Sequence, residues 1–485
     1  CDRRQRQMCI RDSPYTDQTE DIRTNRLSAD LAYTLPVGAH SELNLATAYV
    51  YHKRQATNDT FLHDYMDSHK DPAHPDEDGA TPPVELMRPY LAKENTVTPS
   101  LTFTSILGSH TLLAGVQGYF TRLRETGLYV ISAEDEKASP YYGVPYTSIG
   151  KKHANEVGFF VQDEWNITPK LTVVPGIRVD SHSSGEEYST SVKVSDSAFP
   201  STKFSKTSVN PRIAVKYELS PSLILRANVG TGFRAPYGFS EDLHLCSGSP
   251  RVWKSSNLKG ERAVSYNVSA DYYARKYQFS VNIFRTNLKD KIQFSPADDE
   301  VKKFGYSYQW ENVDDAYVQG VELGAKANLF RNFTAGLNWT FNQGKFKHER
   351  AEWSDPDDET VKQFPQRLQY AKDSRHISRF PSMTGDLDLD YTPGTWTFSV
   401  TGSLQGRMYI DYNSEDAGAT SKIKKTSPFM LFNCRASKRF GMCTVYAGAK
   451  NIFSYIQDEK HTDDAAFMYA PVYGATWYAG LSVKL

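Results

Sequence analysis

The 485-residue sequence lacks any long apolar run. No stretch approaches the roughly 20 consecutive apolar residues that a transmembrane helix needs, which excludes a helical membrane protein. The sequence also lacks an excess of positive charge, because 56 Lys and Arg residues face 57 Asp and Glu residues, for a formal net charge of −1. A nucleic-acid partner requires a basic footprint, so we expect none.

Cysteine is scarce, and the five cysteines form neither a zinc-binding spacing nor a dense disulfide framework. Cys434 and Cys443 fall on the apolar faces of neighbouring alternating segments, so we interpret them as lipid- or core-facing thiols rather than a disulfide. Catalytic signatures are missing too: the sequence has no G-x-S-x-G, no H-E-x-x-H and no phosphate-binding loop. We therefore expect neither an enzyme nor a cofactor.

What the sequence has is aromatic residues, 13% of the total, and a repeated alternation of apolar and polar residues. In residues 170–182, for example, Leu171, Val173 and Ile177 alternate with Thr172 and Arg178. Period-two alternation is typical of a strand with one apolar and one polar face. About seventeen such segments are predicted: 26–35, 41–54, 93–107, 109–125, 152–165, 170–182, 204–219, 222–233, 262–274, 276–289, 316–329, 332–345, 381–392, 395–409, 428–439, 442–451 and 474–485.

The connections between these segments alternate strictly in length. Short turns, such as Gly108 and Pro393–Gly394, join the two members of each pair, and polar loops of roughly 18–38 residues join one pair to the next. Short turns at one end and long loops at the other are typical of an outer-membrane barrel, whereas a soluble β-sandwich mixes loop lengths. The sequence thus predicts an all-β fold, a transmembrane antiparallel β-barrel. We expect Trp165, Trp339, Trp396 and Trp477 in belts at the two ends of its apolar band.

The loop between residues 233 and 262 carries a specific motif. Phe233-Arg234-Ala235-Pro236, followed by Asn257-Leu258-Lys259-Gly260-Glu261, resembles the FRAP…NPNL-(K/R)-PE pair of TonB-dependent outer-membrane receptors. Ser255-Ser256 and Gly260 depart from that pattern. The stretches 157–180 (VGFFVQDEWNITPKLTVVPGIRVD), 311–323 (ENVDDAYVQGVEL) and 450–453 (KNIF) are also similar to family stretches, in the family's order.

The resemblance implies a barrel of about 22 strands, of which about seventeen are recognised here. We expect residues 26–485 to be an incomplete barrel without the family's plug domain, and residues 1–25 to be a non-native or loop remnant. The charged start lacks the apolar core of a signal peptide, and residues 3–13 resemble translated adapter sequence, so we expect the natural N-terminus to be missing.

The function that the resemblance implies is active transport across the outer membrane of a Gram-negative bacterium. The expected partners are outer-membrane lipid, TonB acting through the missing plug, and a scarce ligand: a small iron chelate such as a ferric siderophore, haem or cobalamin. The alternatives are a passive porin-like channel and a surface-binding barrel without energy coupling.

The expected ligand site is extracellular. The loop Arg234–Arg262 follows an outward-running strand, and we expect it to bind ligand together with the loops Gln55–Ala92 and Phe346–Lys372. Aromatic and cationic groups supply contact area and charge-assisted bonds, so the candidates are Tyr237, His244, Arg251 and Trp253. The resemblance implies that His244 is a haem ligand if the ligand is haem.

Two further predictions concern charged side chains. Arg234 is expected to pair with an acid in the lumen such as Asp271 or Glu322, rather than with ligand. The acidic residues Asp64, Asp67, Asp71 and Asp76 could bind calcium, although a solvated acidic loop is the default interpretation.

Overall fold

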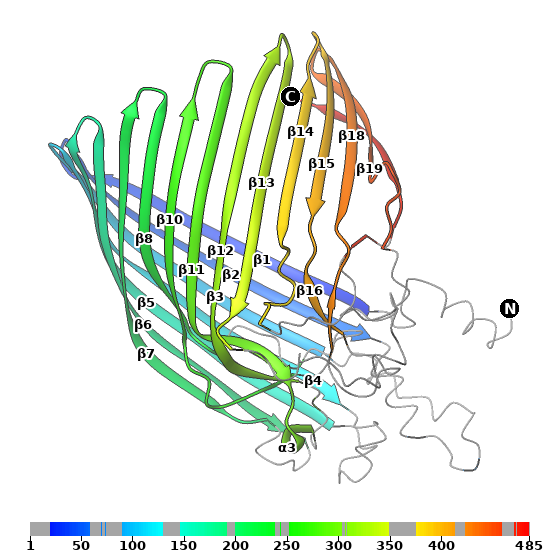
Figure 1. Ribbon diagram of the computed structural model, residues 1–485. Helices are drawn as coiled ribbons and strands as arrows, with labels where there is room; N and C mark the ends of the chain where they lie inside the picture. Colours follow the sequence, from blue (N-terminus) through cyan, green and yellow to red (C-terminus); the bar gives the residue numbers. More distant parts are fainter. Residues whose placement is uncertain are drawn as a thin grey trace.

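The computed structural model describes residues 20–58, 69, 73, 90–129, 146–191, 199–237, 243, 252–302, 306, 308–348, 375–412, 422–457, 470–471 and 473–484, which are almost entirely strand (Figure 1). The first strands are β1 (Glu20–Pro36), β2 (Ser41–Asn58), β3 (Tyr90–Leu107), β4 (His110–Tyr129), β5 (Tyr146–Thr168), β6 (Leu171–Thr190), β7 (Thr202–Ser220), β8 (Leu223–Arg234), β9 (Val252–Lys254) and β10 (Glu261–Tyr273). The remaining elements are β11 (Tyr277–Pro296), α3 (Asp299–Lys302), β12 (Tyr308–Phe330), β13 (Phe333–Phe346), β14 (Met383–Tyr391), β15 (Trp396–Gln405), β16 (Tyr409–Tyr412), β17 (Lys422–Lys425), β18 (Phe429–Phe440), β19 (Cys443–Lys450) and β20 (Thr476–Val483).

The main sheet has eighteen strands, seventeen of which form its wall, while the short β9 is added from a loop. Wall strands pair antiparallel with their neighbours in chain order, from β1 and β2 to β19 and β20. The predicted strand count is therefore confirmed. Within the described residues no ladder joins β1 to β20, in agreement with the expected incomplete barrel, and β16 pairs with β17 separately.

Tight turns connect the strands at one end of the wall, drawn at the top of Figure 1. Gly38, Gly108, Gly394 and Gly441 all have φ between 58° and 75° there. The two-residue turns at Gly108 and Gly441 require this left-handed region, and the four-residue turns at Gly38 and Gly394 also use it; glycine enters it without a steric penalty. The long connections all leave from the opposite end, so the predicted alternation of turn and loop is confirmed.

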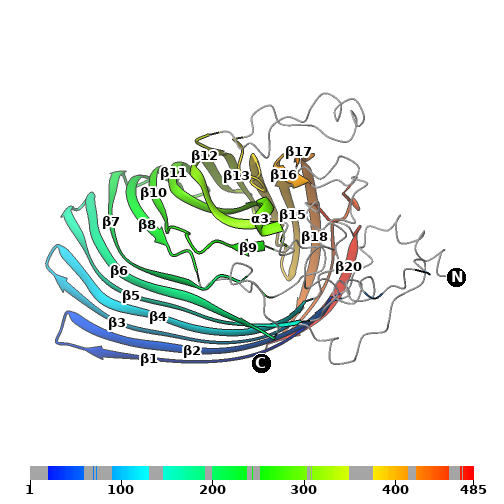
Figure 2. The same cartoon turned by 90° about the horizontal axis from the view of Figure 1, so that it is seen from below.

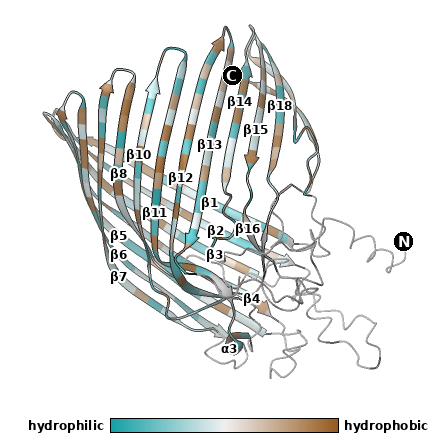
Figure 3. Cartoon of the chain, viewed as in Figure 1, coloured by the Kyte–Doolittle hydropathy of each residue, from teal (hydrophilic) through white to brown (hydrophobic). Residues whose placement is uncertain are grey.

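The outer face of the wall is apolar and the inner face is polar. Leu45, Phe159 and Ile177 are exposed on the outer face, whereas Arg178 and Asp180 lie on the inner face. Figure 3 shows the resulting mixture of hydrophobic and hydrophilic residues along each strand. A barrel in lipid needs this arrangement, because the side chains that face the acyl chains must be apolar.

The four tryptophans predicted for the belts lie on the outer face, and not in the lumen. Trp165 lies just before a short turn and Trp396 just after one, and both are about two-fifths exposed. Trp477, at the start of β20, is 78% exposed. Trp339 pairs with Leu323 and is partly exposed. Their height relative to a membrane interface stays a prediction.

Charged residues on the inner face form ion pairs. Arg178 binds Asp180 at 2.5 Å and approaches Glu156 at 3.5 Å, and His182 contacts Glu156 at 3.1 Å. On the outer face, Cys434 is opposite Val400, and both Cys434 and Cys443 are free thiols.

The start of the sheet differs from the predicted domain boundary. β1 begins at Glu20, and residues 20–25 pair with β2 as far as Asn58, so they belong to the sheet and not to a remnant. Residues 1–19 lie outside the described part of the chain. Among the described residues, no helix is both long and apolar enough to cross a membrane.

Candidate ligand site at the extracellular mouth

The loop between β8 and β10 turns inward over the mouth of the barrel. Its strand β9 pairs in parallel with the outer end of β12, where Trp253 is opposite Gln309. Figure 2 shows β9 inside the curve of the sheet. Because β8 and β12 are separated by two other strands, this loop crosses part of the opening.

The FRAP arginine holds the base of this loop. Arg234 Nη2 lies 3.0 Å from Glu261 Oε2, and Glu261 also accepts a hydrogen bond from the backbone N–H of Ile292 at 2.9 Å. Arg234 and Glu261 are cross-strand partners in β8 and β10. The first and last residues of the loop are thus joined by a charge-assisted hydrogen bond.

The prediction that Arg234 pairs with an acid is confirmed, but the predicted partners are wrong. Asp271 pairs with Arg226 instead, and Glu322 accepts a hydrogen bond from Asn282 at 2.8 Å. Register explains the difference: Asp271 lies at the turn end of β10, opposite Ile224, and so is far along the strand from Arg234.

Gly260 has a physical reason for departing from the family pattern. A Cβ atom at this position would collide with the ring of Phe233 and would lie 3.2 Å from the carbonyl oxygen of Arg234. The Phe233 ring also packs on His182, with ring centroids 4.8 Å apart. Proline carries a Cβ, so this placement of Phe233 requires glycine.

A second motif meets the first at Asn312. Its Oδ1 accepts the backbone N–H of Lys259 at 2.7 Å, and its Nδ2 donates to the carbonyls of Lys259 at 3.0 Å and Asp290 at 2.8 Å. The two family-like stretches are therefore side by side in the structure, where one fixes the backbone of the other.

Tyr237 is buried, with 2% of its surface exposed. Its hydroxyl donates to the carbonyl of Ser255 at 2.9 Å and accepts the backbone N–H of Leu258 at 2.9 Å. Burial raises the pKa of Tyr237 to about 12; the nearby Glu186 carboxylate acts in the same direction, and the bond from Leu258 opposes them. The hydroxyl is thus used within the loop, and ligand contact by Tyr237 stays a prediction.

The other predicted ligand residues are only partly described. Trp253 is half-buried and lines a cavity of about 20 Å³ together with Tyr188 and Phe199. His244 and Arg251 lie outside the described residues, as do Asp64, Asp67, Asp71 and Asp76. Among the residues that the structure describes, no three His, Cys, Asp or Glu side chains gather closely enough to hold a metal ion.

Two buried ion pairs beneath the loop were not predicted from the sequence. Lys254 Nζ lies 2.9 Å from Glu186 Oε1, and Lys152 Nζ lies 2.6 Å from Glu125 Oε1, with all four side chains buried. Alternation places Lys152 and Glu186 on the inner face, but nothing in the sequence pairs Glu186 with a lysine 68 residues away. A charge removed from water needs such a partner.

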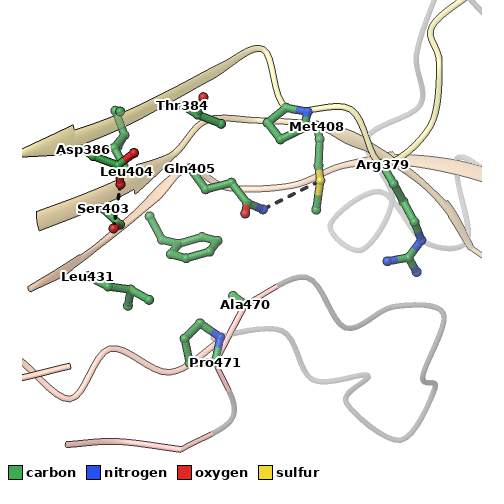
Figure 4. Close-up of a pocket in the computed structure, with 13 residues that line it drawn as sticks. Arg379, Thr384, Asp386, Ser403, Leu404, Gln405, Met408, Leu431, Ala470 and Pro471 are labelled. Atoms are coloured by element: carbon green, nitrogen blue, oxygen red, sulfur yellow. Dashed lines mark hydrogen bonds between the residues drawn. The ribbon is translucent and has the colours of Figure 1, made fainter. Parts of the chain in front are cut away.

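A larger cavity, of about 790 Å³, opens at the outer ends of β14, β15 and β18 (Figure 4). On one side, Asp386 accepts a hydrogen bond from Ser403 at 2.9 Å, and Gln405 lies 3.8 Å from the sulfur of Met408. Pro471, which precedes β20 in the chain, lies on the other side. The walls of this open cavity mix polar and apolar side chains.

Fold and site together define a class: an outer-membrane-type β-barrel with an inward-folded extracellular loop. The family model "TonB dependent receptor-like, beta-barrel" matches residues 6–452, and the chain belongs to this family. The family is one of outer-membrane receptors of Gram-negative bacteria.

Similar proteins cover different parts of the chain. A vitamin B12 transporter from Photobacterium profundum is 26% identical over 44% of this chain and 28% of its own length. A ferric enterobactin receptor from Pseudomonas aeruginosa is 28% identical over 38% of this chain and 24% of its own length. The chain therefore matches less than a third of either relative.

Solved structures confirm the fold. A copper transporter superimposes with a TM-score of 0.65 at 18% identity, over 95% of this chain and 65% of that one. The ferric yersiniabactin receptor of Yersinia pestis gives a TM-score of 0.62 at 12% identity, over 95% of this chain and 60% of that one.

Proposed function

We propose that this barrel is the receptor and transport body of a TonB-dependent uptake system. It captures a scarce ligand at its extracellular mouth, and the ligand then passes through the polar lumen. The observation that carries the proposal is the family match over residues 6–452. The polar inner face and the loop folded into the mouth support it.

The ligand belongs to the class of ferric siderophore, haem or cobalamin. Relatives with these ligands in their names support this range, including a vitamin B12 transporter, a ferric enterobactin receptor and a hemoglobin-binding protein. We propose the mouth as its site, between the loop that carries Tyr237, His244, Arg251 and Trp253 on one side and the cavity beside Asp386 on the other.

Binding of each labelled ligand to cells that produce the full-length protein tests this site. Deletion of residues 238–251 removes the centre of the loop and spares the Tyr237 and Lys254 contacts that hold its ends. We expect the deletion to abolish binding of the one true ligand. Unchanged binding of every ligand by the deletion variant would refute the loop assignment.

Single substitutions identify the ligand class. If the ligand is haem, His244→Ala abolishes growth on haem, because an axial bond to iron has no substitute nearby in the sequence. If it is a siderophore or cobalamin, His244→Ala has little effect, while Arg251→Ala and Trp253→Ala weaken binding. Lys170→Ala is a control, since Lys170 is exposed at a short turn of the opposite rim.

A further inference from the structure

Four cations form one row on the outer face of the barrel. Lys53 of β2 is directly opposite Lys93 of β3, Lys93 is opposite Arg124 of β4, and Arg124 is opposite Lys151 of β5. We call Lys53, Lys93, Arg124 and Lys151 the cation row. These four strands lie side by side in the wall (Figure 2).

Residues on either side show that the row faces outward. The next residues along each strand, such as Lys152, Glu125 and Ala92, are buried on the inner face. Lys93, Arg124 and Lys151 are exposed, and Lys53 is partly exposed. Successive residues of a strand point to opposite faces, so the cation row projects away from the lumen.

Like charges directly opposite one another destabilise a sheet, since their Cβ atoms are only about 5 Å apart. Within the described residues, none of the four side chains has an ion-pair or hydrogen-bond partner. The row ends at Asn25 of β1 and at Glu187 of β6, which faces Lys151. One flanking carboxylate leaves most of this charge to be neutralised from outside the chain.

The height of the row on the wall indicates what neutralises it. Toward the short turns, the next rung on this face is still polar and consists of Tyr51, Asn95, Arg122 and His153, where Arg122 donates a hydrogen bond to Asn155 at 2.7 Å. The face then continues through Tyr49, Val97 and Phe120 to the apolar rung of Leu45, Leu101, Val116 and Phe159. The rung of Leu43, Phe103, Ala114 and Val161 lies beside the turns. Ten residues separate Leu43 from Lys53, which is about 33 Å along a strand and, at a tilt of about 40°, about 25 Å in height.

That height equals the roughly 25 Å of an apolar barrel band, so the cation row lies at its extracellular edge. The anionic groups at this level of a membrane are the phosphates of lipid headgroups. Lysine and arginine reach them with their stems along the apolar wall and their charges in the polar layer. We propose that the cation row binds phosphate-bearing lipid headgroups of the outer leaflet.

The test uses two lipids that differ only in the phosphate. Pyrene-labelled phosphatidic acid and pyrene-labelled diacylglycerol are each equilibrated with the purified full-length protein in an uncharged detergent, and the retained label is measured. We expect preferential retention of phosphatidic acid, weakened by high salt. A combined Lys53→Gln, Lys93→Gln, Arg124→Gln and Lys151→Gln variant should bind it at least about tenfold less tightly.

A matched control variant also replaces four cations by Gln, but at the short-turn end of the wall. Lys170, Arg275, Lys276 and Arg331 are exposed at the short turns, and their combined substitution by Gln should leave lipid retention unchanged. Arginine in place of the three lysines of the cation row should preserve retention.

Stability adds a second readout that a merely misfolded variant would not give. In uncharged detergent without phosphatidic acid, the Gln variant should melt at the same temperature as the natural protein or higher, because like-charge repulsion is removed. With phosphatidic acid, only the natural protein should gain thermal stability. Equal retention of both lipids, or an equal loss in the rim control, would overturn the proposal. A third outcome would also overturn it: the Gln variant still retains phosphatidic acid but no longer binds a soluble anionic polysaccharide that the natural protein binds.

Discussion

At the scale of single residues, buried charges hold the extracellular loop. Lys254 and Glu186 form a buried ion pair, and breaking such a pair by removing one member costs about 3–5 kcal/mol, whereas replacing both by apolar residues costs far less. We expect Lys254→Met alone to increase proteolytic cleavage of the loop strongly. The double variant Lys254→Met with Glu186→Leu should be cleaved at nearly the natural rate. If Lys254→Met and Glu186→Leu increase the cleavage rate additively, the two side chains do not form the ion pair.

Tyr237 gives a pH-dependent prediction. Its pKa is about 12 in the folded protein, compared with about 10 for a free tyrosine. A raised pKa means that the fold favours the neutral phenol, so this contribution to stability is complete below pH 10 and is lost as the pH rises from about 10 to 12. Absorbance of the phenolate, measured as the difference between the natural protein and Tyr237→Phe, should titrate near pH 12. A difference titration at pH 10 would show that the hydroxyl is not buried.

At the scale of strands, glycine makes room for the ion pairs of the lumen. A Cβ on Gly158 of β5 would collide with both Asp180 and Arg178 on the neighbouring strand β6. Both contacts are side-chain ends that can move aside at the expense of the Arg178–Asp180 ion pair, so Gly158→Ala should lower the free energy of unfolding by about 1 kcal/mol. The matched control is Gly232→Ala in β8, where the nearest atom to the new Cβ is 4.0 Å away. Denaturant titration in detergent checks both, and equal stability of the two variants would refute this packing.

The strands were largely predictable from the sequence, and their contacts at the mouth were not. Apolar–polar alternation and the turn glycines predict the hairpins, because both signals are local in the sequence. The outer ends were predicted too short: β5 begins at Tyr146 rather than 152, and β12 at Tyr308 rather than 316. These ends project past the apolar band, so polar residues on both faces hide the alternation. Arg234 received the wrong partner because only the register identifies Glu261.

At the scale of the whole molecule, the two faces of the wall have separate tasks. The inner face carries paired charges such as Arg178 with Asp180, and the extracellular loop closes over that face. The outer face is apolar and ends at the cation row, which we propose to be a lipid contact. Substitutions in the cation row should therefore alter lipid retention without altering ligand affinity, and binding assays with the full-length protein check this separation. Loss of ligand affinity in the cation-row variant with lipid retention intact would contradict it.

The most direct test of energised uptake compares transport with and without TonB. Entry of labelled ferric siderophore, haem and cobalamin is measured in matched host cells that produce the full-length protein and either contain or lack TonB. We predict that one ligand accumulates only in cells with TonB, while its surface binding is the same in both hosts. Equal accumulation in the two hosts would show passive diffusion through the barrel and contradict the proposed function.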